Sequence, residues 1–409
     1  MSSKAINLEA LHYYLSYRHV PTPLSAIDGV RREPLLTFPD LRFSPPHELS
    51  KDEIVDRMDE MVQGYVRKVL DEQRDNAGFF LSGGLDSGIV TAVAATLTDS
   101  FRPLRTFCLT YGGNDETAGK KTDREYARWI AELYGTRHRE RAIYFEDFPA
   151  VLPNILRYIG EPFSGYVSVW FLSRFVKSWG IDVAFSGDWA DELFGSYKVH
   201  RLAYQTPHQH PWELRYSDSV FGDREKQSLY SKDVRQVMKK YSTMHHLEKY
   251  FTNGLTADDS LNRMLEMELK YIFPDNVYMS VLKMSQYHGL EIRTPYSSPE
   301  FVEFAAKIPG SLKMKDGVTK YPLKQLALRY LPEEIVNRKK EGFVTPTMPL
   351  VLELEKFVRD TLALARLGEH GLFDIDYVWQ LIEEFYNAPT EQQAYKLWSL
   401  VCFQVWYDL

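Results

Sequence analysis

The chain has 409 residues, 44% of them hydrophobic and 26% charged, which is the composition of a folded globular protein and excludes a disordered one. Its net charge of −7 gives no electrostatic reason to expect a nucleic-acid partner. Two cysteines, Cys108 and Cys402, are too few for a disulfide framework or a cysteine-ligated zinc site, and no run approaches the ~20 apolar residues of a membrane helix. We therefore expect a cytoplasmic protein that binds neither nucleic acid nor membrane.

Residues 1–50 contain short elements interrupted by prolines, and we interpret them as an N-terminal arm. Within the arm, "PLLTFPDLRFSPP" (34–46) predicts a strand that ends in a proline linker. The following segment, 49–73, has apolar residues at steps of three and four, which predicts an amphipathic helix. Ser50 and Glu53 have the spacing of a capping box at its start.

Strands and helices then alternate, which predicts an α/β fold with a parallel, doubly wound sheet and helices on both faces. The expected strands lie in "NAGFFLSGG" (76–84), "LRTFCLTYG" (104–112) and "VAFSGDWADELFG" (183–195), with helices in 89–97 and 123–135. From about residue 245 the pattern is mostly helical, with clear segments at 257–273 and 297–310. We expect a nucleotide half (51–240) and a helical half (241–409) within one larger domain (51–409).

The turn "SGGLDS" (82–87) follows the first of these strands and opens a helix. Gly83 and Gly84 let backbone amides approach a ligand closely, and the helix N-terminus and the hydroxyls of Ser82 and Ser87 also favour an anion. Asp86 would repel a bare phosphate, so its presence points to Mg²⁺ between the carboxylate and the phosphate oxygens. The lysine and the spacing of a Walker P-loop are absent, which disfavours ordinary γ-phosphate transfer.

This turn resembles the pyrophosphate-binding PP-loop of ATP pyrophosphatases, which cleave ATP between the α and β phosphates and adenylate a substrate. Further stretches resemble, in the same order, the synthetase domain of asparagine synthetases: "IGEPF", "VAFSGDWADELFGSY", "GLEIRTPYSSPEFVEFAAKIP" and "TKYPLKQLALRYLPEEIVNRKKEGFVTP". The arm itself resembles the segment that joins the glutaminase and synthetase domains of that family. The likeness covers most of the chain.

The family's N-terminal glutaminase domain, with its N-terminal cysteine nucleophile, has no counterpart here: residue 2 is serine and the first cysteine is Cys108. We therefore expect that the chain does not hydrolyse glutamine itself. The nitrogen would come from free ammonia, from an amine-bearing substrate or from a separate glutaminase subunit.

The resemblance implies roles for individual residues around ATP and Mg²⁺. Asp86 and Asp191 would hold the Mg²⁺, and Lys320 would neutralise the charge that develops at the reacting phosphate. Lys340, with Arg338, matches a second basic element near the pyrophosphate. Further family positions expected around ATP are Leu81 and the strand "TFCLTYG" beside the adenine, Ser82, Gly83, Gly84, Ser87 and Gly187 in the two turns, and the acids Asp123 and Glu161.

The acceptor side departs from the family pattern, while the ATP side is nearly intact. Asp188 occupies the slot of a family glutamate that is suggested to handle the incoming nitrogen or the acceptor, so it is our second catalytic candidate beside Lys320. Large Trp189 stands where a glycine is common, and two family acids are lost near Lys283 and at Ser298. We therefore predict ordinary ATP chemistry on an acceptor carboxylate other than free aspartate.

Three alternatives to this amide-ligase hypothesis stay open. The first is a glutaminase-independent asparagine synthetase that uses ammonia. The second is a PP-loop sulfur-transfer enzyme, which two scattered cysteines and the negative charge disfavour. The third is a non-catalytic nucleotide-binding partner subunit, which the presence of Asp86, Asp191 and Lys320 disfavours.

Overall fold

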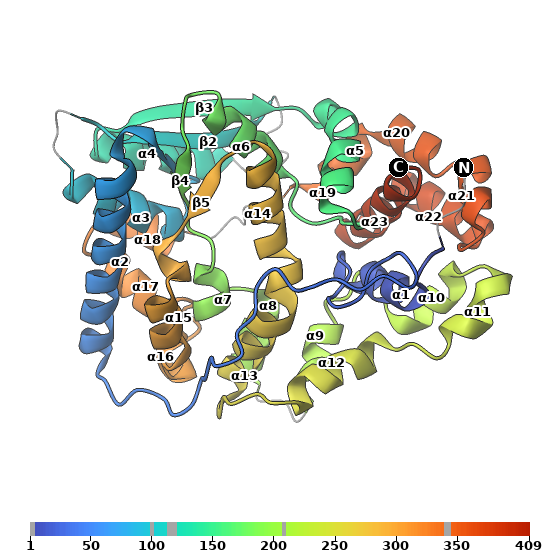
Figure 1. Cartoon of the computed structure of the whole chain (residues 1–409), viewed down its shortest axis with the longest axis horizontal. Helices are drawn as coiled ribbons and strands as arrows, with labels where there is room; N and C mark the ends of the chain where they lie inside the picture. The colour runs from blue at the N-terminus through green and yellow to red at the C-terminus, as the bar shows by residue number, and fades with distance from the viewer. Residues whose placement is uncertain (1–4, 99–101, 113–120, 207–209, 339–344) are drawn as a thin grey trace.

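The computed structural model describes residues 5–98, 102–112, 121–206, 210–338 and 345–409. Its centre is a five-stranded sheet in the order β3-β2-β1-β4-β5, in which every neighbouring pair is parallel (Figure 1). The strands are β1 (Ala77–Phe80), β2 (Arg105–Tyr111), β3 (Arg137–Ile143), β4 (Val183–Phe185) and β5 (Glu291–Arg293). The predicted α/β class with a parallel sheet is confirmed.

Helices surround the sheet and make up most of the chain after β4. Those up to β4 are α1 (Leu8–Tyr17), α2 (Lys51–Gln73), α3 (Leu85–Thr96), α4 (Lys121–Leu133), α5 (Phe148–Ile159) and α6 (Ser168–Lys177). Between β4 and β5 lie α7 (Ala190–Phe194), α8 (Lys198–Gln205), α9 (Pro211–Tyr216), α10 (Asp223–Leu229), α11 (Lys232–Met238), α12 (Thr243–Thr252), α13 (Ser260–Met267), the π-helical turn η3 (Glu268–Ile272), η4 (Phe273–Asp275) and α14 (Val277–Tyr287). After β5 come α15 (Pro299–Ala306), α16 (Gly310–Lys313), α17 (Tyr321–Ala327), α18 (Glu333–Asn337), α19 (Thr347–Glu353), α20 (Glu355–Thr361), α21 (Leu364–His370), α22 (Ile375–Asn387) and α23 (Glu391–Tyr407).

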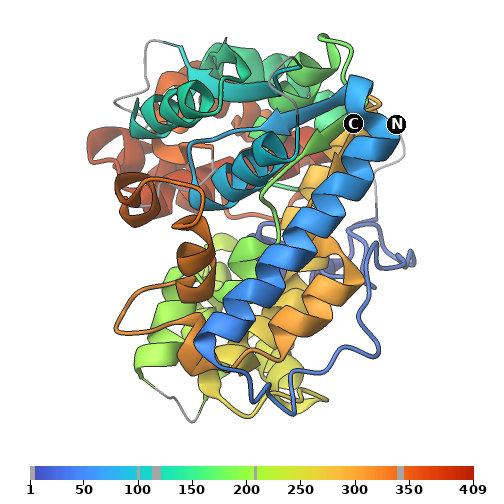
Figure 2. The same ribbon diagram turned by 90° about the vertical axis from the view of Figure 1, so that its left-hand side faces the viewer.

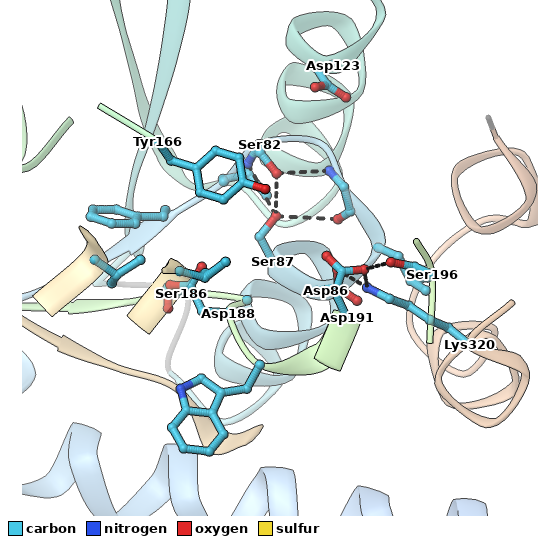
Figure 3. A pocket seen from close by; sticks show the side chains of 18 of the residues that line it. Ser82, Asp86, Ser87, Asp123, Tyr166, Ser186, Asp188, Asp191, Ser196 and Lys320 are labelled. Carbon is cyan, nitrogen blue, oxygen red and sulfur yellow. Dashed lines mark hydrogen bonds and ion pairs between the residues drawn. The ribbon is translucent and has the colours of Figure 1, made fainter. Parts of the chain in front are cut away.

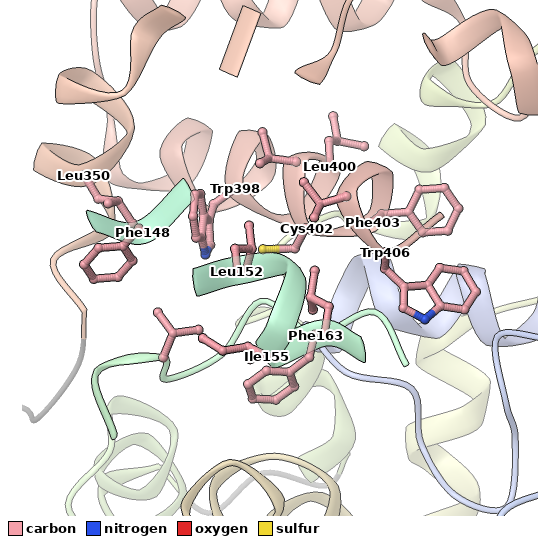
Figure 4. Close-up of a cluster of buried hydrophobic side chains, with 14 of the residues drawn as sticks. Phe148, Leu152, Ile155, Phe163, Leu350, Trp398, Leu400, Cys402, Phe403 and Trp406 are labelled. Atoms are coloured by element: carbon pink, nitrogen blue, oxygen red, sulfur yellow. The ribbon is translucent and has the colours of Figure 1, made fainter. Parts of the chain in front are cut away.

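The central strands carry apolar side chains on both faces, because alternate residues of β1, β2 and β4 enter different cores. In β2, Phe107 and Leu109 join a core with α5, α6, α14 and α23, whereas Cys108 joins a core with α2, α3, α4, α15 and α17. Figure 4 shows part of the first core, where Trp398 and Cys402 of α23 lie near Leu152 of α5. In Figure 2 the long α2 crosses the front of the molecule, on the side of the second core. Both cores combine residues from before and after residue 240, and the division expected there stays a prediction.

Helix α2 begins with the capping box that the sequence predicted. The Ser50 backbone N–H donates to the Glu53 carboxylate at 2.8 Å, and the Glu53 N–H donates to Ser50 Oγ at 3.3 Å. The strand predicted in the arm is wrong, because residues 34–46 form no ladder with the sheet. Its prolines lack backbone donors, and the N–H of Phe43 donates instead to Thr256 Oγ1 at 2.8 Å.

Two buried carboxylates attach the arm to the body. Glu161 accepts hydrogen bonds from Ser25 Oγ at 2.6 Å and from the N–H of Ala26 at 2.7 Å. Asp275 accepts from the N–H and the hydroxyl of Thr22 at 2.7 and 2.8 Å. Arg32 lies between the two acids. Among the described residues, none of the helices has both the length and the apolar character needed to cross a lipid bilayer.

Candidate active site

A cavity of about 460 Å³ opens at the carboxyl ends of β1, β2 and β4. Parallel sheets bind their ligands at this edge, and both turns predicted from the sequence lie there. In Figure 3, Ser82 and Ser87 occupy the middle, with Tyr166, Ser186 and Asp188 on one side of them and Asp86, Asp191, Ser196 and Lys320 on the other. Leu81, expected beside the adenine, lines the cavity together with Cys108, Leu109 and Tyr111 of β2.

The first turn joins β1 to α3 and packs against the start of α4. Gly83 has φ +71°, and a Cβ there would lie 2.2 Å from the carbonyl oxygen of Asp123, so only glycine fits. The hydroxyl of Ser82 lies 3.1 Å from that of Ser87 and accepts from the N–H of Gly84 at 3.3 Å. The turn is therefore held in shape by its own serines.

The second turn follows β4 and touches the first. A Cβ on Gly187 would lie 2.6 Å from the backbone nitrogen of Ser87 and 2.8 Å from Cβ of Asp86, so the glycine permits the two turns to meet. This contact brings Asp191, in the first turn of α7, close to Asp86, in the first turn of α3. Two segments that are far apart in the sequence thus form one acidic edge of the cavity.

Lys320 lies between these two carboxylates. Its Nζ is 2.6 Å from Asp86 Oδ2 and 2.6 Å from Asp191 Oδ1, and Ser196 Oγ donates to the same oxygen of Asp191. Burial alone would lower the pKa of the ammonium, but the attraction of Asp191 and Asp86 outweighs it and raises that pKa. The lysine predicted to be catalytic and the two aspartates predicted to bind the metal therefore meet in one cluster.

A second ion pair borders the first turn. Arg338 lies 2.5 Å from Asp123 Oδ1, and its guanidinium lies over the ring of Tyr126, 5.1 Å from the centroid. A Cβ on Gly84 would be 3.8 Å from Arg338 Nη2, so this basic group faces the turn, and its role near the pyrophosphate stays a prediction. Lys340, the other residue of that basic element, is outside the described residues.

Two further acids, Asp188 and Glu192, line the cavity. Burial raises the pKa of Asp188 to about 6, and the carboxylates of Asp191 and Asp86 add to the shift. Burial and the neighbouring Asp191 also raise the pKa of Glu192, whose Oε1 accepts from the hydroxyl of Tyr197 at 2.6 Å. A carboxylate whose pKa lies near 6 is ionised at neutral pH and basic enough to take up a proton.

Three positions expected near the site have other contacts. Glu161 does not line the cavity, since its carboxylate holds the arm through Ser25 and Ala26. Ser298 caps α15 by accepting from the N–H of Phe301 at 3.2 Å, and the ammonium of Lys283 lies over the ring of Tyr158. Neither Ser298 nor Lys283 lines the cavity, so of the positions where the chain leaves the family pattern, Asp188 and Trp189 do.

Sequence reasoning missed several residues that line the cavity. Tyr166 and the residues Val169 and Leu172 of α6 form part of its wall, as do Val277 and Val281 of α14. Burial raises the pKa of Tyr166 to about 12, so it stays a neutral hydrogen-bond donor. The one available signal was the short distance in sequence between Tyr166 and the quoted "IGEPF" segment.

The cavity offers one unpartnered oxygen on an acid and one unpartnered nitrogen on a base, which together fit MgATP. Among the described residues, the buried Oδ1 of Asp86 and the buried Nη1 of Arg338 have no hydrogen-bond partner. The first is a free acceptor for a cation, and the second is a free donor for an anion such as a phosphate. No cluster of three or more metal-binding side chains occurs in the described ranges, so two aspartates would share the ion with phosphate oxygens and water.

These features define an α/β enzyme with an anion-binding glycine turn and an acid–lysine cluster at the edge of a parallel sheet. A family model described as asparagine synthase matches residues 57–408, which is most of the chain. The chain belongs to this family, and it is a ligase that forms a carbon–nitrogen bond.

Two relatives are 26% and 29% identical to this chain over the aligned residues. The glutamine-hydrolyzing asparagine synthetase 1 of Bacillus subtilis is 26% identical over 453 residues, which cover 99% of the chain and 69% of the relative. Asparagine synthetase 3 of the same organism is 29% identical over 336 residues, which cover 78% of the chain and 52% of the relative. Among solved structures, an NMN synthetase from Francisella tularensis is 12% identical to this chain, with a TM-score of 0.26. The match covers 54% of this chain and 94% of the NMN synthetase chain, and it is too weak to indicate a shared function.

Proposed function

We propose that this ligase adenylates a carboxylate with MgATP and passes the acyl group to ammonia or an amine. An oxygen of the carboxylate attacks the α-phosphorus, the bond between that phosphorus and the α–β bridging oxygen breaks, and pyrophosphate leaves. The nitrogen nucleophile then attacks the acyl carbon, loses a proton, and AMP departs. The first step converts a poor leaving group into a good one.

The observation that carries the proposal is the position of Lys320 between Asp86 and Asp191 beside the glycine turn. In this proposal the turn holds the departing pyrophosphate, and the ammonium of Lys320 neutralises charge that develops on it. Asp86 and Asp191 would hold Mg²⁺, which supplies further positive charge to the phosphate oxygens. Arg338 would contribute the free Nη1 donor to the same anion.

Asp188 is the proposed acceptor of the proton that the nitrogen loses. Its carboxylate lines the cavity, and its raised pKa suits a base that works near neutral pH. Tyr166, which lines the same cavity, would donate a hydrogen bond to the substrate.

Exchange of labelled pyrophosphate into ATP tests the proposal, because it requires adenylation but no nitrogen donor. A panel of carboxylic acids, with aspartate among them, should contain at least one acid that supports exchange and, with ammonia or an amine, AMP release. If no acid supports either reaction while MgATP still binds, the proposal of an adenylating ligase is wrong.

The relatives named above are glutamine-hydrolyzing asparagine synthetases, so asparagine synthesis, here with ammonia as the nitrogen source, is the second candidate function. Pyrophosphate exchange that is supported by aspartate and by no other acid of the panel would favour this second candidate. Sulfur transfer has less support, because Cys108 and Cys402 are both buried and burial raises the pKa of the Cys402 thiol.

A further inference from the structure

Trp189 has a backbone conformation that tryptophan rarely adopts. Its φ is +78°, in the left-handed region, although it carries a large side chain. It stands directly after Asp188 and precedes α7, and it lines the cavity. Strained backbone of this kind persists where surrounding contacts enforce it, and it is concentrated at active sites and ligand clamps.

Aromatic side chains from two parts of the chain hold Trp189 in place. Its ring centroid lies 4.8 Å from that of Phe273 in η4, 5.9 Å from that of Tyr278 in α14, and 5.8 Å from that of Phe38 in the arm. All three pairs meet edge to face, and Trp189 is 6% exposed. The side chain is therefore a fixed wall of the cavity and not a movable cover.

The cavity has a charged side and an apolar side. Lys320 pairs with Asp86 and Asp191, Lys324 lies one helical turn after it, and the guanidinium of Arg201 donates to the carbonyl of Ser196. Arg338 pairs with Asp123 beside the glycine turn. These four are the lysines and arginines that line the cavity within the described part of the chain.

Around Asp188 and Tyr166 the lining is different. Aliphatic side chains of two helices line the cavity: Val169 and Leu172 of α6, which begins just after Tyr166, and Val277 and Val281 of α14, whose Tyr278 packs on Trp189. The acids Asp188, which directly precedes Trp189, and Glu192, in the first turn of α7, also line the cavity. A carboxylate on the body of a substrate would therefore find negative charge and apolar surface but no described cation.

Phosphoryl chemistry indicates which side the acceptor uses, if the function proposed above is correct. The attacking and leaving oxygens lie roughly in line through the reacting phosphorus. With pyrophosphate at the glycine turn and Lys320, the acceptor carboxylate approaches the α-phosphorus from the opposite side. That side carries Asp188, Trp189 and Tyr166.

We infer that Trp189 is a specificity-determining residue that selects an acceptor acid with an apolar body and no second carboxylate. The inference rests on the proposed ligase function and narrows it. Aromatic and aliphatic monocarboxylic acids fit the wall formed by Trp189, Val277 and Val281, whereas aspartate and succinate bring a second negative charge next to Asp188. The nitrogen becomes cationic when it attacks the acyl carbon, and until it loses its proton it fits those same acids.

Pyrophosphate exchange with phenylacetate, hexanoate, succinate and aspartate tests the inference. The wild-type enzyme should show a kcat/KM for phenylacetate or hexanoate at least tenfold above that for either dicarboxylic acid. Trp189→Phe, which keeps a buried aromatic ring, should raise KM for the favoured acid by about tenfold, the size expected for a poorer fit in an apolar pocket. Its kcat and its binding of MgATP should change much less.

Trp179→Phe is the matched control, because Trp179 is 47% exposed and lies against Arg139. It should leave every acid unchanged. Exchange with aspartate or succinate as fast as with phenylacetate and hexanoate would overturn the inference and leave the ligase function intact. Unchanged acid selectivity in folded Trp189→Phe would overturn the role of Trp189. Exchange with no acid at all, despite MgATP binding, would overturn the ligase function and the inference with it.

Discussion

Lys320 donates a hydrogen bond to Asp86 across 234 positions of the chain, at 2.6 Å. The ammonium lies between two carboxylates that are the candidates for holding Mg²⁺, so it stands where a cation is needed when ATP is absent. Its backbone is itself in the left-handed region, with φ +54°, directly before α17. The lysine therefore has a defined position before any substrate binds.

Replacing Lys320 should show how much its ammonium stabilises the two neighbouring carboxylates. Lys320→Met leaves Asp86 and Asp191 near one another without a cation, and breaking a buried pair costs about 3–5 kcal/mol. Because both carboxylates are partly exposed, we expect a loss of about 1–3 kcal/mol in the free energy of unfolding. Excess MgCl₂ should raise the Tm of this variant more than that of the wild type.

Lys324→Met removes the same charge one helical turn away and is the matched control. It should show no added response of Tm to Mg²⁺. An equal response in Lys320→Met and the wild type would argue against Asp86 and Asp191 as metal ligands.

Asp86→Asn should keep the shape of the side chain and remove its charge. We expect at least a hundredfold lower pyrophosphate exchange, because one metal ligand and one partner of Lys320 are lost together. Asp52→Asn, at an exposed acid on the outer side of α2, should leave exchange unchanged. Full activity in Asp86→Asn would exclude the metal role of this residue.

Gly83→Ala should disrupt the contact between the first turn and α4. The added Cβ would lie 2.2 Å from the carbonyl oxygen of Asp123, in addition to the roughly 1–2 kcal/mol that a positive φ costs an L-residue. We expect loss of ATP binding, measured by calorimetry. Gly135→Ala has a positive φ but no atom within 4 Å of the new Cβ, so it should lose about that stability and keep ATP binding. Similar ATP binding in the two variants would show that the close approach at Gly83 is unimportant.

The raised pKa of Asp188 predicts a pH dependence with a definite sign. Between its ordinary value of 3.8 and its folded value of about 6, the folded state binds more protons than the unfolded state. Stability therefore falls as pH rises through this window, by at most about 3 kcal/mol at 1.36 kcal/mol per pKa unit. Asp188→Asn removes the effect, so urea denaturation should show the variant gaining stability relative to the wild type as pH rises from about 4 to about 7.

The same group should affect amide formation without affecting adenylation. As pH falls through about 6, Asp188 becomes protonated, and the rate of transfer to the amine should decline while pyrophosphate exchange keeps its rate. In Asp188→Asn that pH dependence should vanish along with most of the transfer activity. A pH profile of transfer that is identical in the variant and the wild type would remove Asp188 as the base.

Glu161→Gln tests the attachment of the arm. The glutamine side chain has one acceptor oxygen and one NH₂ group, so the donors Ser25 Oγ and Ala26 N–H can no longer both find a charged acceptor. Such a loss at a buried site lowers the free energy of unfolding by about 1–3 kcal/mol. Hydrogen exchange of residues 20–32 should become faster. Glu303→Gln, at an exposed acid of α15, should change neither stability nor exchange.

Local patterns predicted the elements that form the centre of the site. The strand before "SGGLDS", the helix after it, and the capping box of Ser50 and Glu53 are each encoded within a few residues. Strand β3 gave no such signal, because an edge strand that pairs with β2 alone tolerates the charged sequence "RHRERAI". The three residues of β5 are too few for a periodic pattern.

The pairing of Lys320 with Asp86 and Asp191 had no local signal either, and only the family resemblance placed the three residues together. The position of Glu161 shows the limit of that resemblance. Its acid type suggested a ligand contact, but two donors of the arm lie within hydrogen-bond reach, and burial favours pairing with them. Contacts between distant segments depend on the packed structure and cannot be deduced from neighbouring residues.

The attachment of the arm has a consequence for how such chains can recombine. Thr22 and Ser25 are matched to acceptors at Asp275 and Glu161, and Phe38 is matched to Trp189. A crossover near residue 50 that joined the arm of one relative to the body of another would separate partners that must vary together. The arm and the body therefore form one unit in recombination, and a crossover at the proline-rich end of the arm would disrupt it.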